Sequence, residues 1–344
     1  MTVLVSLQTK DSIVAGCDSL ATQSKDFINP ADIIDRYFDI NTKNIDILKD
    51  GAGNPLLDNA IKLVELVQKI PYNHLSQVTK LYSLDPMKII VLTTGIASIG
   101  KRTIRYLIED FQVKVLKHIS SDYTVRTIGN KLRRHFRKAY NKIYPPQRTP
   151  LKPYLELMIT GYSSRFREPE TWRIYVHLNK LVPSLKRGKF GVAYGGQYKE
   201  IERIIKGTDS KNYQNMEDRH FVKILEYKSK VENLLQRRNL KVRLPNPLSD
   251  ANYQKFRMQE GGWKLDKFES IYGDFSEQNS VDFVNWMVDI MIKAQQFNNR
   301  MPTVGGDVHI ALLTKKDGFE FISKEVLTHA THEVYKSQLR RNKE

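Results

Sequence analysis

The chain has 344 residues, and 40% of them are hydrophobic, which is enough for a sizeable core without requiring two domains. Charged residues interrupt the apolar runs before any of them reaches the roughly 20 residues that a membrane-spanning helix needs. Cys17 is the single cysteine, which excludes an internal disulfide framework and favours a reducing compartment such as the cytoplasm. We expect Cys17 to be a small buried side chain.

The chain is basic, with 55 Lys and Arg against 38 Asp and Glu, a formal net charge of +17. Such a balance can indicate binding to nucleic acid or to an acidic surface. The densest basic run, residues 131–138, lies within a helical pattern. No zinc-finger spacing, RNP-like aromatic motif or Gly-rich phosphate loop accompanies it. The pattern favours a solvated helix face, and nucleic-acid binding stays an alternative that rests on net charge alone.

The first 22 residues predict a β-hairpin. Two β-rich runs, residues 3–7 and 13–17, flank four turn-forming residues. The hairpin begins at residue 2, without the basic start and apolar core of a secretory signal. Because Thr2 is small, we expect removal of Met1, which would leave a hydroxyl and an amine on one residue. An α-amino group has a pKa of about 7.7–8.0 and can serve as the base for that hydroxyl.

A polar segment and a buried strand follow the hairpin. Residues 23–75 are polar at first, contain a Gly-Pro loop signal at 50–55, and show helical spacing within 56–70. Residues 76–86 contain Lys80 and end in an Asp-Pro turn. Residues 89–95 then predict a buried strand that ends at a glycine.

Helices and strands alternate in the rest of the chain. We expect amphipathic helices over residues 98–119 and 124–144, the second ended by two prolines, and one over 281–297 that Asn279 or Ser280 caps. Residues 207–278 are charged and partly helical, from 221 to 236, and show no recognisable chemistry. The expected strands are residues 154–162, 172–177 and 189–198 and the hairpin 303–321 with its Asp-Gly turn.

These segments, taken in order, resemble the catalytic β-subunits of the proteasome and their bacterial proteasome-like relatives. Those subunits begin, once matured, with a threonine that opens a strand, and their second strand ends in Asp-Ser-x-Ala-Thr. Residues 18–22 have this ending, and the spacing from Thr2 to Asp18 matches without a gap. The resemblance covers most of the chain apart from the tail and two insertions, residues 23–75 and 207–278.

The resemblance implies an α+β fold of the N-terminal nucleophile (Ntn) hydrolase type. Such a fold is a four-layer αββα sandwich, in which two antiparallel sheets face each other and helices lie outside. The order of the predicted helices and strands is compatible with this arrangement. We therefore expect one domain over residues 1–344, with helical insertions.

The resemblance also implies a catalytic site and no cofactor or metal. Thr2 would attack a carbonyl, Lys80 would stabilise the alkoxide-like state, and Asp18 would keep Lys80 charged and aimed. Thr94 and Gly95 occupy the oxyanion-hole turn, where a backbone N–H would stabilise the tetrahedral intermediate.

Several positions depart from the family pattern. Thr94 replaces a glycine, Tyr194 and Val304 replace serines, and Met301 replaces an aspartate. Candidates to replace the lost support are Asn298, Asn299 and Asp307.

Three classes of function stay open. The first is a threonine hydrolase of peptide or amide bonds, which Thr2, Asp18 and Lys80 favour. The second is a catalytically inactive scaffold subunit, which the departures at Tyr194, Met301 and Val304 favour. The third is a basic nucleic-acid-binding protein. The resemblance further implies self-association into rings and a peptide or protein substrate, and leaves any unfoldase partner unknown. The short apolar runs favour no membrane partner.

Overall fold

The computed structural model describes residues 2–39, 46–57, 63, 66–75, 78–119, 121–145, 152–164, 166–206, 210–238, 240, 272–297 and 302–323. Contacts divide the chain into two units, one of Met1–Gln197 with Tyr272–Glu344 and the other of Tyr198–Ile271. The second unit overlaps the insertion expected at 207–278, and the single domain over residues 1–344 stays a prediction. All the candidate site residues belong to the first unit.

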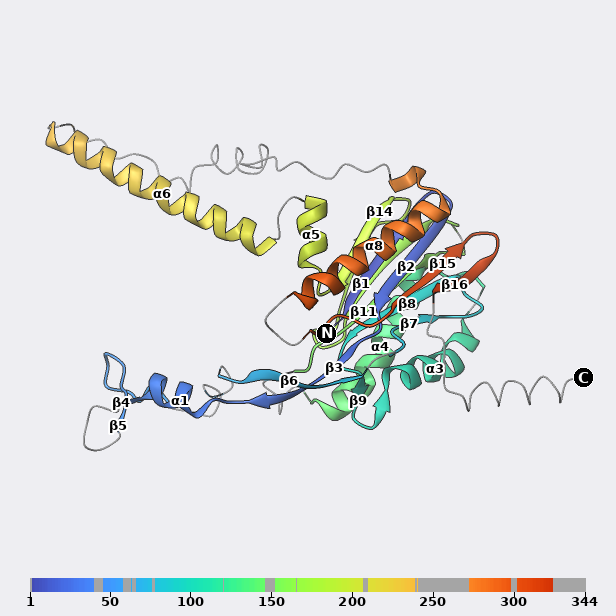
Figure 1. Cartoon of the computed structure of the whole chain (residues 1–344), viewed down its shortest axis with the longest axis horizontal. Coiled ribbons are helices and arrows are strands. Elements are labelled where there is room, and N and C mark those ends of the chain that lie inside the picture. Colours follow the sequence, from blue (N-terminus) through green and yellow to red (C-terminus); the bar gives the residue numbers. More distant parts are fainter. Residues whose placement is uncertain are drawn as a thin grey trace, which may run out of the picture. The chain divides into compact units, whose positions relative to one another are not determined.

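The first sheet of this unit carries the predicted N-terminal hairpin. Its five antiparallel strands, in order, are β14 (Gly191–Gly196), β1 (Val3–Gln8), β2 (Ser12–Asp18), β15 (Val308–Thr314) and β16 (Gly318–Ser323). Helix α8 (Glu277–Gln296) lies along β1, β2 and β15 on the outer face (Figure 1). Strands β1 and β2 are buried along their whole length, because α8 covers one face and the second sheet covers the other.

The second sheet also has five antiparallel strands. Their order is β13 (Lys180–Leu185), β12 (Pro169–Tyr175), β11 (Leu155–Tyr162), β8 (Ile89–Gly95) and β7 (Leu81–Ser83). Helices α3 (Ile104–Lys114) and α4 (Val125–Ile143) cover its outer face through a common apolar core. The hydroxyl of Thr124 accepts the N–H of Thr127 at 3.1 Å and so caps α4.

The inner faces of the two sheets share a second apolar core. Leu4, Ala15 and Cys17 of the first sheet pack with Leu92 and Met158 of the second. The layers are therefore helix, sheet, sheet and helices, and the expected α+β sandwich of four αββα layers is confirmed.

The segment over residues 23–75 differs from the expectation. Strand β3 (Ala21–Phe27) pairs with β6 (Gln68–Leu75), so residues 68–70 of the expected helix are extended; residues 58–62, 64 and 65 of that helix lie outside the described part. A helix missed from the sequence, α1 (Pro30–Tyr37), begins at Pro30, where the side chain of Asn29 accepts the N–H of Ala31 at 3.2 Å. Two short strands, β4 (Phe38–Asp39) and β5 (Asp46–Ile47), pair after α1.

Other boundaries of helices and strands also differ from those expected from the sequence. Residues 98–103, expected to begin a helix, form the short strands β9 (Ser98–Ile99) and β10 (Arg102–Thr103), and a 3₁₀ turn, η1 (Leu116–His118), follows α3. The cap expected at Asn279 or Ser280 is wrong, because the hydroxyl of Ser276 accepts the N–H of Asn279 at 3.1 Å, and α8 therefore begins earlier. A second 3₁₀ turn, η2 (Tyr272–Asp274), precedes it.

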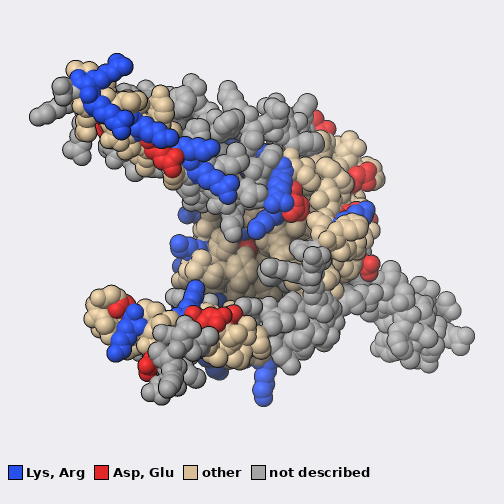
Figure 2. All heavy atoms as spheres, turned by 60° about the vertical axis from the view of Figure 1, so that its left-hand side comes forward, with Lys and Arg blue, Asp and Glu red and all other residues tan. Residues whose placement is uncertain are grey.

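The second unit contains α5 (Lys199–Lys206) and the 28-residue α6 (Ser210–Arg237), which is longer than the expected helix over 221–236. Lys and Arg side chains lie along α6 with Asp and Glu among them, at the upper left of Figure 2. In the described part of the chain, every helix is too short or too polar to cross a membrane.

Candidate functional site

Thr2 lies immediately before strand β1 of the first sheet, and it is 4% exposed. Its carbonyl oxygen accepts the N–H of Gln197 at 2.8 Å and the hydroxyl of Thr94 at 3.5 Å. These contacts come from the chain after β14 and from the end of β8, so both sheets hold the backbone of Thr2. Met1 lies outside the described residues, and its removal stays a prediction.

Asp18, at the end of β2, is fully buried and accepts three hydrogen bonds. Its Oδ1 accepts the N–H of Val3 at 3.0 Å, and its Oδ2 accepts the N–H of Gly305 and the Nζ of Lys80, each at 3.1 Å. Because Val3 follows Thr2 directly, this carboxylate connects the Lys80 ammonium to the backbone next to Thr2.

Lys80, just before β7, is 5% exposed. Its ammonium also donates to the carbonyl of Leu20, as a buried cation requires partners. Its own carbonyl accepts the N–H of Thr93 at 2.9 Å, which attaches Lys80 to β8. The structure thus brings together Lys80 and Asp18, which are 62 positions apart in sequence.

Burial sets the protonation of the groups around this pair. Burial raises the pKa of the Asp18 carboxyl above its ordinary value, while the Lys80 ammonium and the N–H groups of Gly305 and Val3 act in the opposite direction. Burial also raises the pKa of the neighbouring Cys17 thiol to about 12. The thiol is therefore neutral near pH 7 and a poor nucleophile.

The end of β8 carries a backbone N–H on the side away from β11. The N–H of Thr93 points toward Lys80, and the N–H of Ile96 donates to the carbonyl of Tyr154 at 3.0 Å on the β11 side. Because N–H groups alternate along a strand, the N–H of Thr94 points toward β11 and that of Gly95 points to the other side of β8, away from β11. Gly95 has a φ of +108°, and a Cβ there would lie 2.2 Å from the carbonyl oxygen of Tyr154, so this turn needs glycine.

Gly196 allows the close approach of β14 to Thr2. Its φ is +70°, and a Cβ would lie 1.9 Å from the carbonyl oxygen of Thr2. The paired glycines are visible in the sequence as a strand end, but their contact with Thr2 is not.

The structure also locates several of the positions that depart from the family pattern. Tyr194 lies opposite Val5 in the pairing of β14 with β1, and the side chain of Val304 is buried. Among the candidates for replacement support, Asp307 donates its backbone N–H to Ser19 at 2.7 Å. Met301, Asn298 and Asn299 lie outside the described part of the chain.

Two glutamines near this site were not expected from the sequence. Gln295 of α8 donates its Nε2 to the Oε1 of Gln197 at 3.0 Å and accepts the N–H of Thr303 at 3.3 Å. A glutamine near the end of an amphipathic helix and another after a strand have no local pattern that indicates such a pair.

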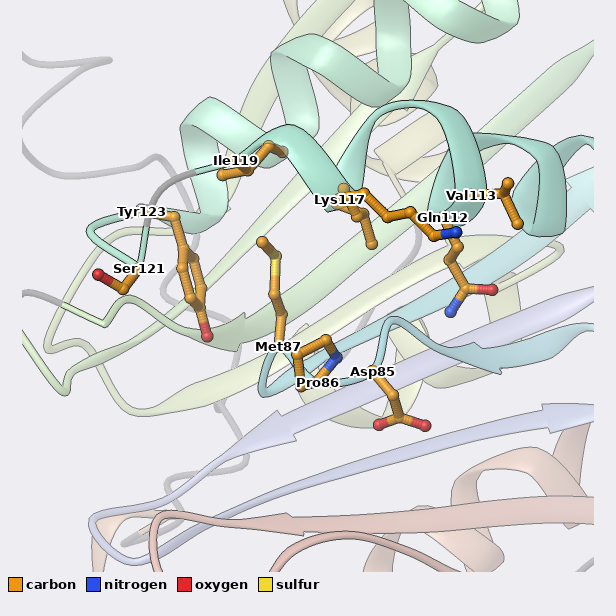
Figure 3. Close-up of a pocket in the computed structure, with 10 residues that line it drawn as sticks. Asp85, Pro86, Met87, Gln112, Val113, Lys117, Ile119, Ser121 and Tyr123 are labelled. Carbon is orange, nitrogen blue, oxygen red and sulfur yellow. The ribbon is translucent and has the colours of Figure 1, made fainter.

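A surface cavity of about 630 Å³ lies elsewhere, between the loop of residues 85–87 and the α3–η1 segment (Figure 3). Its lining includes Met87, Leu116 and Tyr123 and none of the expected site residues. Within the described ranges, no group of three or more His, Cys, Asp and Glu side chains could hold a metal ion.

The sequence matches no protein-family model and no curated protein. Similar solved structures include the Anbu complex from Pseudomonas aeruginosa, which was solved as a helical assembly. The two sequences are 9% identical, the match covers 99% of this chain and 93% of that chain, and the TM-score is 0.48. An Anbu (Gly-1) mutant from Hyphomicrobium sp. strain MC1 has 8% identity, coverages of 99% and 96%, and a TM-score of 0.44. Anbu (ancestral beta-subunit) from Yersinia bercovieri has 9% identity, coverages of 99% and 93%, and a TM-score of 0.44.

These neighbours correct the family expected from the sequence. The assignment to proteasome β-subunits is wrong, because the similar structures are Anbu proteins. At such low identities and TM-scores the likeness decides no function, and the function of this chain has to be inferred from its own residues.

Proposed function

We propose that the chain is an N-terminal threonine hydrolase of amide bonds, with Thr2 as the nucleophile after removal of Met1. The observation that supports it best is the buried pair of Lys80 and Asp18, in which the carboxylate also binds the N–H of Val3. A buried ion pair is weak evidence for stability alone, and perturbed groups of this kind gather at functional sites.

In the proposed reaction the Thr2 amine takes the proton of the Thr2 hydroxyl, and the Oγ attacks the carbonyl carbon of the substrate. Lys80 stabilises the developing negative charge, and the N–H of Gly95 donates to the oxyanion, a contribution of about 2.7–4 kcal/mol per donor. The protonated amine then gives its proton to the leaving amine as the C–N bond breaks. Water hydrolyses the resulting ester on Thr2 and regenerates the amine and the hydroxyl.

The test is covalent labelling of purified protein with a β-lactone probe, after intact mass and N-terminal sequencing have shown whether Met1 is removed. We expect an adduct on Thr2 that is absent from Thr2→Ala and Lys80→Ala. The matched control is Lys316→Ala, at an exposed lysine, which should label like the wild type.

Two results would contradict the proposal. Retention of Met1 in every molecule removes the amine that acts as base. A lack of labelling in protein that starts at Thr2 favours the inactive scaffold, and the apolar side chain at Val304 then becomes the natural explanation.

A further inference from the structure

The carbonyl of Thr2 is connected to helix α8 through Gln197. The backbone N–H of Gln197 donates to the Thr2 oxygen at 2.8 Å. The side-chain oxygen of the same Gln197 accepts the Nε2 of Gln295 at 3.0 Å. A shift of Gln295 would therefore be passed to Thr2 across a single intervening residue.

The other end of the Gln295 amide holds the segment before β15. Its Oε1 accepts the backbone N–H of Thr303 at 3.3 Å and the hydroxyl of Thr303 at 3.5 Å. Two residues later, the N–H of Gly305 donates to Oδ2 of Asp18 at 3.1 Å. Because Oδ1 of Asp18 binds the N–H of Val3, these contacts close a ring that returns to Thr2.

We infer that Gln295 is a positioning residue that sets the placement of Thr2 relative to the Asp18 carboxylate and the Lys80 ammonium. This role rests on the proposed function. A primary amide can donate on one side and accept on the other, which is what the two neighbouring segments require. Helix α8 is a firm base for it, because Met287, Val288 and Met291 of the same helix are buried against the first sheet.

The ring supplies support that the side chain at residue 304 cannot. Val304 is apolar and buried, so residue 304 offers only its backbone for polar contacts, and Gln295 holds the turn at the neighbouring Thr303. The same amide holds Gln197 on the opposite side of Thr2.

The first test compares Gln295→Leu with the control Gln296→Leu, an exposed position one residue further along α8. Leucine keeps the approximate size of the side chain and removes all three hydrogen bonds of the amide. We expect the rate constant for β-lactone acylation of Thr2 to fall by about 10²-fold, the effect of a misplacement near 1 Å. The fraction of molecules labelled at the end of the reaction and the Tm should both equal those of Gln296→Leu. A purely structural role would instead lower that fraction and the Tm and leave the rate constant unchanged.

The second test is rescue by a conservative variant. In Gln295→Glu the carboxylate still accepts from Thr303, and the Gln197 amide can turn to donate to it, so the rate constant should recover most of the loss. Combining Gln295→Glu with Gln197→Glu places two carboxylates together and should abolish the recovery.

Equal rate constants for Gln295→Leu and Gln296→Leu, in a background where wild-type Thr2 is labelled, would overturn the positioning role alone. A wild type that is never labelled at Thr2 would overturn the proposed function and this role with it.

Discussion

At the scale of single residues, Asp18 connects the candidate groups. It is fully buried and receives the Lys80 ammonium on one oxygen and the N–H of Val3 on the other. Lys80 should therefore matter for stability as well as for catalysis, because removing one partner of a buried ion pair leaves an uncompensated charge.

We expect Lys80→Ala to lower the free energy of unfolding by about 3–5 kcal/mol at pH 8, besides abolishing labelling. Without the ammonium, burial raises the pKa of Asp18 further. A carboxyl whose folded pKa is raised adds stability below its unfolded pKa and loses it as pH rises through the folded value. The stability difference between wild type and Lys80→Ala should therefore be smaller at pH 4 than at pH 8. Urea denaturation of both proteins at these two pH values measures it.

The double variant Lys80→Ala with Asp18→Asn provides the control for this explanation. It lacks the buried charge, so its stability should depend less on pH than that of Lys80→Ala. A deficit that is the same at pH 4 and pH 8 in Lys80→Ala would show that lost packing, and not the carboxylate, is responsible.

Cys17 gives a second prediction at this scale. Its thiol has a pKa of about 12 in the folded chain, against about 8.5 in an unfolded one. The folded state therefore holds the proton more tightly, and stability is lost as pH rises between these values. Relative to Cys17→Ala, the wild type should lose about 2 kcal/mol between pH 7 and pH 10, because each unit above 8.5 contributes about 1.36 kcal/mol.

Urea denaturation of both proteins at the two pH values measures this difference. An equal loss in wild type and Cys17→Ala would mean that the thiol titrates alike in the folded and unfolded states. As an independent check, the folded wild type should resist alkylation by iodoacetamide at pH 8 and react after unfolding, because Cys17 is fully buried.

At the scale of elements, the approach of β14 to the start of β1 decides where Thr2 lies. Val3 lies opposite Gly196 and Leu4 opposite Gly195, so the last glycine of β14 meets the Thr2 peptide. The left-handed backbone of Gly196 turns the chain so that the N–H of Gln197 reaches the Thr2 carbonyl.

We expect Gly196→Ala to slow labelling of Thr2 by at least about 10-fold, because its Cβ would overlap the Thr2 carbonyl and displace it. The control is Gly318→Ala, which has a φ of +81° but no atom within 4 Å of the added Cβ. Both variants lose roughly 1–2 kcal/mol through the left-handed backbone. Labelling rates and chemical denaturation of the two variants separate strain from displacement, and equal labelling rates would contradict the contact.

At the scale of the whole molecule, the positive charge is distributed over several parts of the chain. Figure 2 shows Lys and Arg side chains on separate parts of one face, with Asp and Glu among them. Helix α4 contains Lys and Arg but no Asp or Glu, and its exposed cations are Arg126, Lys131, Arg134, Lys138 and Lys142. Two copies that approach through this helix would repel each other at low salt.

Self-association therefore should depend on ionic strength. We expect light scattering coupled to size exclusion to show larger particles at 500 mM than at 50 mM salt, because screening shortens the reach of like-charge repulsion. The variant Lys131→Gln with Lys138→Gln should associate at lower salt than the wild type. A monomer across a wide range of protein and salt concentrations would count against self-association.

Local sequence patterns were enough to predict the α+β class, the strands of the N-terminal hairpin and the helices near 125–143 and 277–296. These features depend on neighbours along the chain. The apolar spacing of Ile128, Leu132, Phe136 and Tyr140 marks one buried helix face, and a glycine after a run of apolar residues marks the end of β8. Successive side chains of the hairpin strands point in turn toward α8 and toward the inner core. β-branched residues suit both of these buried faces.

Contacts between residues far apart in the sequence could not be predicted in this way. The pairing of β3 with β6 overrode part of a helical pattern, because pairing partners from another segment compete with local preference. The contact of Gly305 with Asp18 joins residues 287 positions apart, and that of Gln295 with Gln197 joins residues 98 apart. No local pattern specifies such contacts, since they depend on the path of the chain through both sheets and α8. The sequence could therefore name Thr2, Asp18 and Lys80 through a resemblance, but it could not show that Lys80 is buried or that Gln295 holds both sides of the site.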